Sequence, residues 1–174
     1  MKIQDKETFD KANMFGLGQE NSAFAQYFIG NSYLNPLTKP EECPIFLANV
    51  TFEPGCRNNC HIHRADMGGG RIRICGAGRG DYQEWGGEVR ELLPGYVVNI
   101  PTGVKHWHGA APDSWFSHLA VEVPGENTGN EWCEPVTDEE YEAIRRGSRA
   151  AGMTYGEYVY AAVTFYQANG GGKL

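Results

Sequence analysis

A succession of short β-type segments between residues 44 and 124 is the feature that most restricts the fold of this chain. Each segment is rich in β-branched and aromatic residues, and glycine, proline or asparagine separates one from the next. The predicted strands are 45–53, 71–77, 80–85, 88–92, 96–100, 105–110 and 116–123. No helical pattern lies between them, so the spacing predicts an all-β antiparallel barrel or sandwich.

The segments on either side of this barrel have a different pattern. Residues 1–43 form a mixed N-terminal arm, in which 23–38 is expected to place a short helix or strand over one edge of the barrel. Residues 125–174 form a C-terminal extension with helical character. A chain of 174 residues supplies one good core. We therefore expect one structural domain, with the barrel at 44–124.

Capping boxes predict two helices in the C-terminal extension. Thr137 is followed three residues later by Glu140, and Val136 and Tyr141 are placed to pack together across the start of the helix. The same device predicts a second helix within 154–170, whose aromatic residues recur on one face. This helix is expected to pack on its own barrel or on a second subunit.

Composition excludes several classes of partner. Fifteen basic and 22 acidic side chains give a net charge of −7, and no basic stripe with interleaved aromatic residues occurs, which argues against nucleic acid and anionic membranes. No apolar run approaches the roughly 20 residues that span a bilayer, and the first residues lack a secretory pattern, so we expect a cytoplasmic protein. The five cysteines are irregularly spaced, which argues against a disulfide framework.

Four of the five histidines occur as two His-x-His pairs in short segments that look like β-structure: His61 with His63, and His106 with His108. Side chains two residues apart in a strand share a face. If both pairs face the barrel interior, three or four imidazoles converge, which suits a divalent transition metal at roughly 2.0 to 2.2 Å per nitrogen. A lone histidine is more often a hydrogen-bonded core residue, but two such pairs in one small β domain favour a metal site.

The spacing of these histidines resembles the two motifs of the cupin superfamily. The first motif matches at Gly55, His61 and His63, and the second at Gly95, Pro101, Gly103 and His106, with Ala110 where the family usually has asparagine. The resemblance covers about half of the chain and implies a cupin-type double-stranded β-helix, a jelly-roll barrel. Cupins of this size commonly form homodimers, so a homodimer is expected.

Within the superfamily, the chain looks most similar to small single-domain bacterial cupins, some related to carboxymuconolactone decarboxylase and some to manganese-dependent hydroxynitrile lyases. That resemblance implies His61, His63 and His106 as metal ligands and His108 as an acid/base. It also implies that Ala48, Val50 and Glu122 line the pocket. Glu122 could accept a proton, coordinate the metal or lie in solvent at its strand end. His118 is four residues from Glu122 on the same predicted strand and is expected to face the same cavity.

The chain departs from the family pattern at the fourth metal ligand. The usual gap after His63 reaches Met67, and a four-residue insertion containing three glycines moves the aligned position to Arg71. Arginine cannot ligate a cation. The metal is then held by three histidines with an open position, or Glu122 or water completes its shell, or the site is weakened.

The arginine at the ligand position has its own consequences. Arg71 and Arg73 share strand parity and could bind an anionic substrate through their guanidinium groups, or the glycines could turn both outward. Cys60 and Cys75 could lie near the metal as soft ligands, although packing is the more common role of such cysteines.

Two functions remain open. The first is an enzyme that holds Mn, Fe, Ni or Zn as a Lewis acid and uses histidine acid/base chemistry on a small, possibly anionic molecule in a lyase-like reaction. Dioxygenase and isomerase chemistry are compatible with the same scaffold. The alternative is a non-catalytic cupin that binds or senses a small molecule with a weakened or absent metal site.

Overall fold

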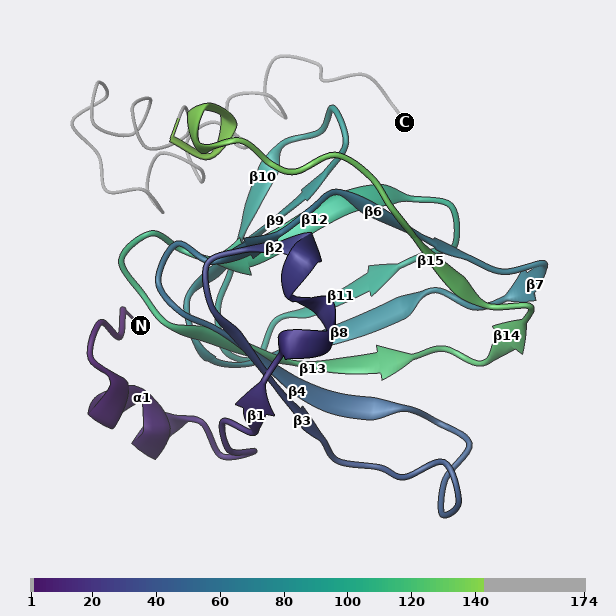
Figure 1. Ribbon diagram of the computed structural model, residues 1–174, viewed down its shortest axis with the longest axis horizontal. Helices are drawn as coiled ribbons and strands as arrows, with labels where there is room; N and C mark the ends of the chain where they lie inside the picture. Colours follow the sequence, from purple (N-terminus) through teal and green to yellow (C-terminus); the bar gives the residue numbers. More distant parts are fainter. Residues whose placement is uncertain (1, 143–174) are drawn as a thin grey trace.

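The computed structural model describes residues 2–142, which form two antiparallel sheets that face each other (Figure 1). The first sheet contains, in spatial order, β1 (Gln19–Glu20), β3 (Ser32–Pro36), β4 (Leu47–Phe52), β13 (Phe116–Glu122), β8 (Arg71–Gly78) and β11 (Val97–Ile100). The second contains β10 (Val89–Leu92), β9 (Gly80–Glu84), β12 (Lys105–Ala110), β5 (Arg57–Asn58) and β2 (Phe28–Ile29), with β6 (His61–Arg64) between β12 and β15 (Gly129–Trp132). This is the all-β, double-stranded β-helix architecture that the sequence predicts.

All seven strands predicted between residues 44 and 124 are present, with boundaries that differ by at most two residues. Strands from outside this range also join the sheets. β3 pairs with β4 from the N-terminal side, and β15 pairs with β6 from the C-terminal side. A small third pair, β7 (Met67–Gly68) with β14 (Gly125–Glu126), lies at one end of the molecule (Figure 1).

The N-terminal arm contains more structure than the sequence analysis predicted. Helix α1 (Lys6–Ala12) begins at Asp5, whose side chain accepts a hydrogen bond from the Thr8 backbone N–H. The buried Phe9 ring stacks on Trp115, with ring centroids 5.3 Å apart, and so anchors the helix outside the first sheet. A short 3₁₀ helix, Ser22–Tyr27, then carries the chain from β1 to β2, from one sheet to the other.

The first predicted C-terminal helix begins where the capping box places it. Residues 138–142 are helical, and the Glu140 backbone N–H donates to Thr137 Oγ1 while Thr137 N–H donates to the Glu140 carboxylate. Val136 and Tyr141 are buried together in one apolar cluster, as the stapled arrangement predicts. The second predicted helix, at 154–170, lies outside the described residues. No helix in residues 2–142 is long and apolar enough to span a bilayer.

The main core lies between the two sheets, where inward-facing side chains of both meet. It consists of Phe52, Cys56, Cys75, Tyr82, Leu92, Ile100, Ala110 and Phe116, all buried. This core fills one part of the space between the sheets, and the histidines fill the adjoining part: the Phe52 ring contacts both His108 and His118, at centroid distances of 5.4 and 5.8 Å.

Candidate metal centre and its cavity

Three histidines from two neighbouring strands converge beside the core. β6 carries His61 and His63 on one face, and the β12 register places His106 directly opposite His61. The ring centroids of His61 and His106 are 4.1 Å apart, and His63 lies 5.1 Å from each. One ligand nitrogen from each of the three lies within 4.8 Å of the others, and all three side chains are buried. This cluster could hold a metal ion.

Hydrogen bonds orient the three imidazole rings so that the Nε2 atoms face the point at which a metal ion could bind. Each Nδ1 faces an oxygen acceptor: the Asn59 carbonyl at 3.0 Å from His61, the Val104 carbonyl at 3.0 Å from His106, and Asn130 Oδ1 at 2.6 Å from His63. An acceptor at Nδ1 places the proton there and leaves the Nε2 lone pair free. The Nε2 atoms of His63 and His106 are buried and have no hydrogen-bond partner among residues 2–142. Orphaned, inward-facing Nε2 atoms with oriented Nδ1–H groups fit a divalent transition metal.

Burial keeps these imidazoles neutral, as metal ligation requires. It holds the pKa of His61 well below its usual value, with the neighbouring His106 acting in the same direction. Burial, followed by the Arg73 charge, lowers the pKa of His63 to about 4 and that of His106 to about 3. At neutral pH the cluster therefore presents lone pairs rather than cationic N–H groups.

His108 and His118 form a second, deeper layer. Both are buried, and their ring centroids are 5.0 Å apart. Asn58 accepts from the His108 backbone N–H at 3.0 Å, which turns its side-chain NH₂ towards the His108 ring, 2.9 Å from Nδ1 and 3.1 Å from Nε2. This contact places a polar group against both nitrogens of the His108 ring. His118 Nε2 lies 3.2 Å from Arg73 Nη1.

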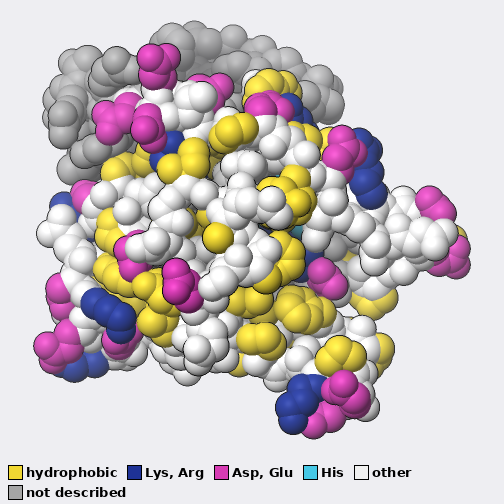
Figure 2. All heavy atoms as spheres, viewed as in Figure 1, with side chains coloured by type: hydrophobic (Ala, Val, Ile, Leu, Met, Phe, Trp, Pro, Cys, Tyr) yellow, Lys and Arg dark blue, Asp and Glu magenta, His cyan; other side chains and the backbone are white. Residues whose placement is uncertain are grey.

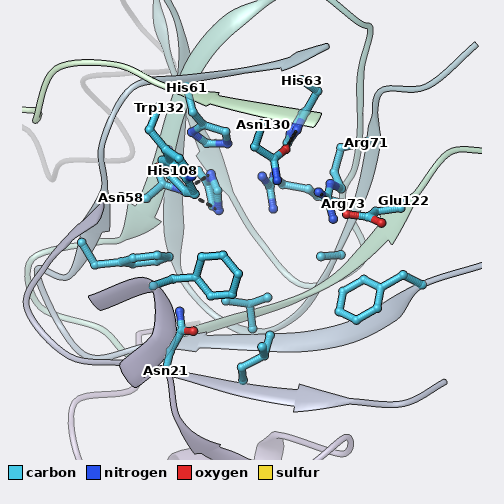
Figure 3. Close-up of a pocket in the computed structure, with 16 residues that line it drawn as sticks. Asn21, Asn58, His61, His63, Arg71, Arg73, His108, Glu122, Asn130 and Trp132 are labelled. Carbon is cyan, nitrogen blue, oxygen red and sulfur yellow. Dashed lines mark hydrogen bonds and ion pairs between the residues drawn. The ribbon is translucent and has the colours of Figure 1, made fainter. Parts of the chain in front are cut away.

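Two arginines and one carboxylate lie on the opposite wall of the same space (Figure 3). Arg71 and Arg73 of β8 are only 9% and 4% exposed. The alternative in which the three glycines turn both arginines outward is therefore wrong. Glu122 lies directly opposite Arg71 in the β13–β8 register, and its Oε1 accepts from Arg71 Nη2 at 2.7 Å.

Two histidines of the cluster, His61 and His63, line a cavity of about 330 Å³ together with His108 and the two arginines. Its polar wall consists of Asn21, Asn58, His61, His63, Arg71, Arg73, His108, Glu122 and Asn130, and its apolar wall of Phe24, Phe28, Leu34, Phe46, Val50, Ala120 and Trp132. Figure 2 shows hydrophobic side chains around a hollow in this face, with a histidine and a basic side chain visible inside it. Val50 thus lines the cavity, whereas Ala48 and His118 are fully buried behind its wall.

No family model matches the chain. It is 42% identical over 118 residues to a protein named (R)-mandelonitrile lyase from Granulicella tundricola, across 67% of this chain and 87% of that protein. It is 36% identical to a cupin-like protein of known structure from Thermotoga maritima, covering 75% of this chain and 95% of that one, with a TM-score of 0.64. This chain belongs to the cupin superfamily. The DMSP lyase DddQ from Ruegeria pomeroyi, at 20% identity, 74% and 60% coverage and a TM-score of 0.51, shares the fold.

Neither Met67 nor Arg71, the two residues considered for the fourth ligand position of the cupin motif, adds a metal ligand to the three histidines. Met67 lies on β7 with 63% of its surface exposed. Arg71 points into the cavity, and the backbone before it explains why: Gly68, Gly69 and Gly70 all have positive φ, and a Cβ at Gly70 would lie 2.6 Å from the Ile100 carbonyl oxygen. The glycine insertion therefore lets β8 start close against β11 and fixes its inward-facing residues.

The two cysteines considered as soft metal ligands are packing residues. Cys75 lies in the core between the sheets, and Cys60 lies in the cluster with Trp107 and Val136. Burial raises the pKa of Cys75 to about 12 and that of Cys60 to about 11, so both remain protonated thiols at neutral pH. Neither belongs to the group that could hold a metal in the described part of the chain.

Among the site residues that the sequence analysis missed, three contact the histidines: Asn58, Asn130 and Trp132. Asn130 and Trp132 belong to β15, where they pair in register with His63 and His61. The Trp132 ring lies 5.0 Å from His61 and stacks on Tyr27 at 4.2 Å. β15 is a four-residue strand in a segment expected to be helical, so its pairing with β6 left no sequence signal. Asn58 stands three residues before His61, and that proximity was the only available hint.

Proposed function

We propose that this cupin is a metal-dependent lyase that acts on a small molecule. The observation that carries the proposal is the set of three neutral imidazoles whose Nε2 atoms converge at the edge of a cavity large enough for a small substrate. His61, His63 and His106 would hold Mn, Fe, Ni or Zn. The bound ion would supply Lewis-acid polarisation of a substrate carbonyl or hydroxyl oxygen.

Proton transfer is proposed for His108 and Glu122, which both line the cavity. His108 is neutral because burial holds its pKa well below the usual value, and it must release the Asn58 contact before it can accept a proton. Glu122 is the more accessible group, since 47% of its side chain is exposed. Its carboxylate, which pairs with Arg71, is the proposed proton acceptor.

Metal analysis tests the proposal first. The protein purified without added chelator should contain close to one transition-metal ion per chain, and His106→Ala should contain almost none. His108→Gln is the matched control, because it changes a buried histidine of the same strand outside the triad and should retain the metal. Wild-type protein that neither contains metal nor takes it up on dialysis would refute the proposal.

Turnover is tested with the substrate that the 42% identical relative's name suggests. Release of benzaldehyde from mandelonitrile, followed by absorbance with and without added Mn, should depend on both metal and His106. Loss of turnover in His108→Gln with the metal retained would support the proton-transfer role. Metal-loaded protein that cleaves neither mandelonitrile nor related cyanohydrins would contradict the cyanohydrin assignment.

A second candidate, a non-catalytic binding cupin, is favoured by one observation. The Arg73 charge lowers the pKa of every histidine in the site, which shows that a buried cation already acts on the position where the metal would add two further charges. Small-molecule binding by metal-free protein, without turnover in any metal-loaded form, would support this candidate. The expected homodimer remains a prediction that light scattering can test, and the expected cytoplasmic location remains one that cell fractionation can test.

A further inference from the structure

Arg73 is a buried cation without a carboxylate partner in the described part of the chain. It is 4% exposed, it lines the cavity, and its Nη1 contacts His118 Nε2, a neutral group. Its Nε is buried without a hydrogen-bond partner, and no ion pair joins Arg73 to an acidic side chain within residues 2–142. A buried charge left uncompensated costs folding free energy, so folded proteins seldom retain one without a use for it.

Arg71 adds a second guanidinium to the same wall. It is paired with Glu122 through Nη2 alone, and its Nε has no partner among the described residues. Two guanidinium groups and one carboxylate thus line the cavity. Because the histidines are neutral, the cavity carries a net charge of about +1 before any metal binds.

The apolar lining determines what else the ligand must contain. Trp132 lies at the other end of the cavity from the arginines (Figure 3), and Phe24, Phe28, Phe46, Val50 and Ala120 also line the cavity. A volume of about 330 Å³ accommodates a ring or short alkyl chain together with one polar head. A ligand that fits both walls has an apolar body and an anionic head.

We infer that the cavity binds small carboxylates with an aryl or alkyl body, and that Arg73, assisted by Arg71, holds the carboxylate. A guanidinium offers two parallel N–H donors that match a carboxylate. Glu122, with its half-exposed side chain, can turn towards the adjoining cavity of about 370 Å³, which it also lines, and so free Arg71 for the ligand. The inference rests on the function proposed above only in placing the ligand in the same cavity, and requires neither metal nor turnover.

The test compares a carboxylate with its neutral isostere. Binding of mandelate and of mandelamide is measured by isothermal titration calorimetry on the full chain, once metal-free and once loaded with Mn. Wild-type protein should prefer mandelate by about 10- to 100-fold. Arg73→Leu should lose that preference while binding the amide within about threefold of wild type, and Arg73→Lys should retain part of it, because the charge remains without the two-pronged geometry.

Arg90→Leu is the matched control. Arg90 is an exposed arginine on β10 that lines neither cavity, so its loss removes the same charge from the protein and should leave the mandelate preference unchanged. Ligand-free Arg73→Leu should unfold at the same temperature as wild type or higher, because it removes an unpaired buried charge.

Equal affinity of wild-type protein for mandelate and mandelamide would overturn the inference without needing any variant. So would an unchanged preference in Arg73→Leu, or no binding of either compound in both metal states. Failure of the proposed function looks different: protein that takes up no metal and cleaves no substrate, yet still prefers the carboxylate through Arg73, refutes the lyase and leaves the carboxylate site standing.

Discussion

Asn130 provides a selective test of how the metal centre is built. Of the three acceptors that orient the histidines, two are backbone carbonyls and one is the Asn130 side chain, 2.6 Å from His63 Nδ1. Substitution can therefore remove the orienting contact of one ligand without touching any ligand. Asn130 is exposed as a residue, so Asn130→Ala should fold normally.

The expected effect follows from the role of that hydrogen bond. Without it, the His63 ring can rotate and its proton can move to Nε2, where it blocks the lone pair. Loss of such an orienting partner typically costs 10- to 100-fold in metal affinity, which corresponds to about 1.4 to 2.7 kcal/mol. Asn130→Asp keeps an oxygen acceptor and adds negative charge, so it should bind metal at least as tightly as wild type.

Competition with a chromophoric chelator for Zn²⁺ measures these affinities directly. Glu131→Ala is the matched control, because Glu131 is the next residue of β15 and its ion pair with Arg64 is solvent-exposed. Asn130→Ala that binds Zn²⁺ within twofold of wild type, under conditions in which His106→Ala has lost binding, would refute the metal centre as described.

Three further predictions concern the ligand position, the core and pH. Arg71→Gln replaces a cation with an amide oxygen at the fourth ligand position and should raise metal affinity by about tenfold or more in the same competition assay; weaker binding would show that this side chain cannot reach the metal. Leu92→Ala removes a fully buried core side chain and should lower the free energy of unfolding in urea by about 2 to 5 kcal/mol without changing metal affinity. In metal-free folded protein the pKa of His63 is lowered to about 4 and that of His106 to about 3. As the pH falls below 6.5, these two histidines therefore bind protons in the unfolded chain but not in the folded chain. Stability should therefore be constant above that pH and fall below it by about 1.4 kcal/mol per histidine per pH unit, and equal unfolding midpoints at pH 7 and pH 5 would contradict this.

Strand alternation explains which parts of the site could be predicted from the sequence. A two-residue period places His61 with His63 and His106 with His108 on shared faces, and the resemblance to the cupin motifs implied that His61, His63 and His106 are the ligands. The same parity correctly put Arg71 and Arg73 on one side of β8. Parity gives the face of a strand but not the depth of a side chain, which is why His118 and Ala48 share the interior face and yet lie behind the cavity wall.

Non-local pairing explains what the sequence could not provide. Whether the glycine insertion would turn the arginines inward depends on three consecutive positive φ angles and on the approach of β8 to the Ile100 carbonyl, 29 residues further along the chain than Arg71. Asn130 reaches His63 from 67 residues away through a short strand with no alternating pattern. In both cases the decisive contact joins segments whose registration is set by the whole sheet.

Arg71 and Arg73 line the same cavity as two histidines of the cluster, so a carboxylate bound by the arginines and a metal ion bound by the histidines should interact electrostatically. A divalent ion at the three histidines would add positive charge beside Arg71 and Arg73, and a bound carboxylate would neutralise part of it, so each ligand should favour the other. By linkage the factor must be identical in both directions, and couplings of this kind are typically 5- to 150-fold, or about 1 to 3 kcal/mol. Mandelate should therefore bind more tightly to Mn-loaded than to metal-free protein, and Mn should bind more tightly by the same factor when mandelate is present.

In Arg73→Leu both sites lose a shared cation: metal affinity should rise without mandelate, and mandelate affinity should fall. Metal affinity that stays unchanged in Arg73→Leu would show that this guanidinium lies too far from the cluster to influence it.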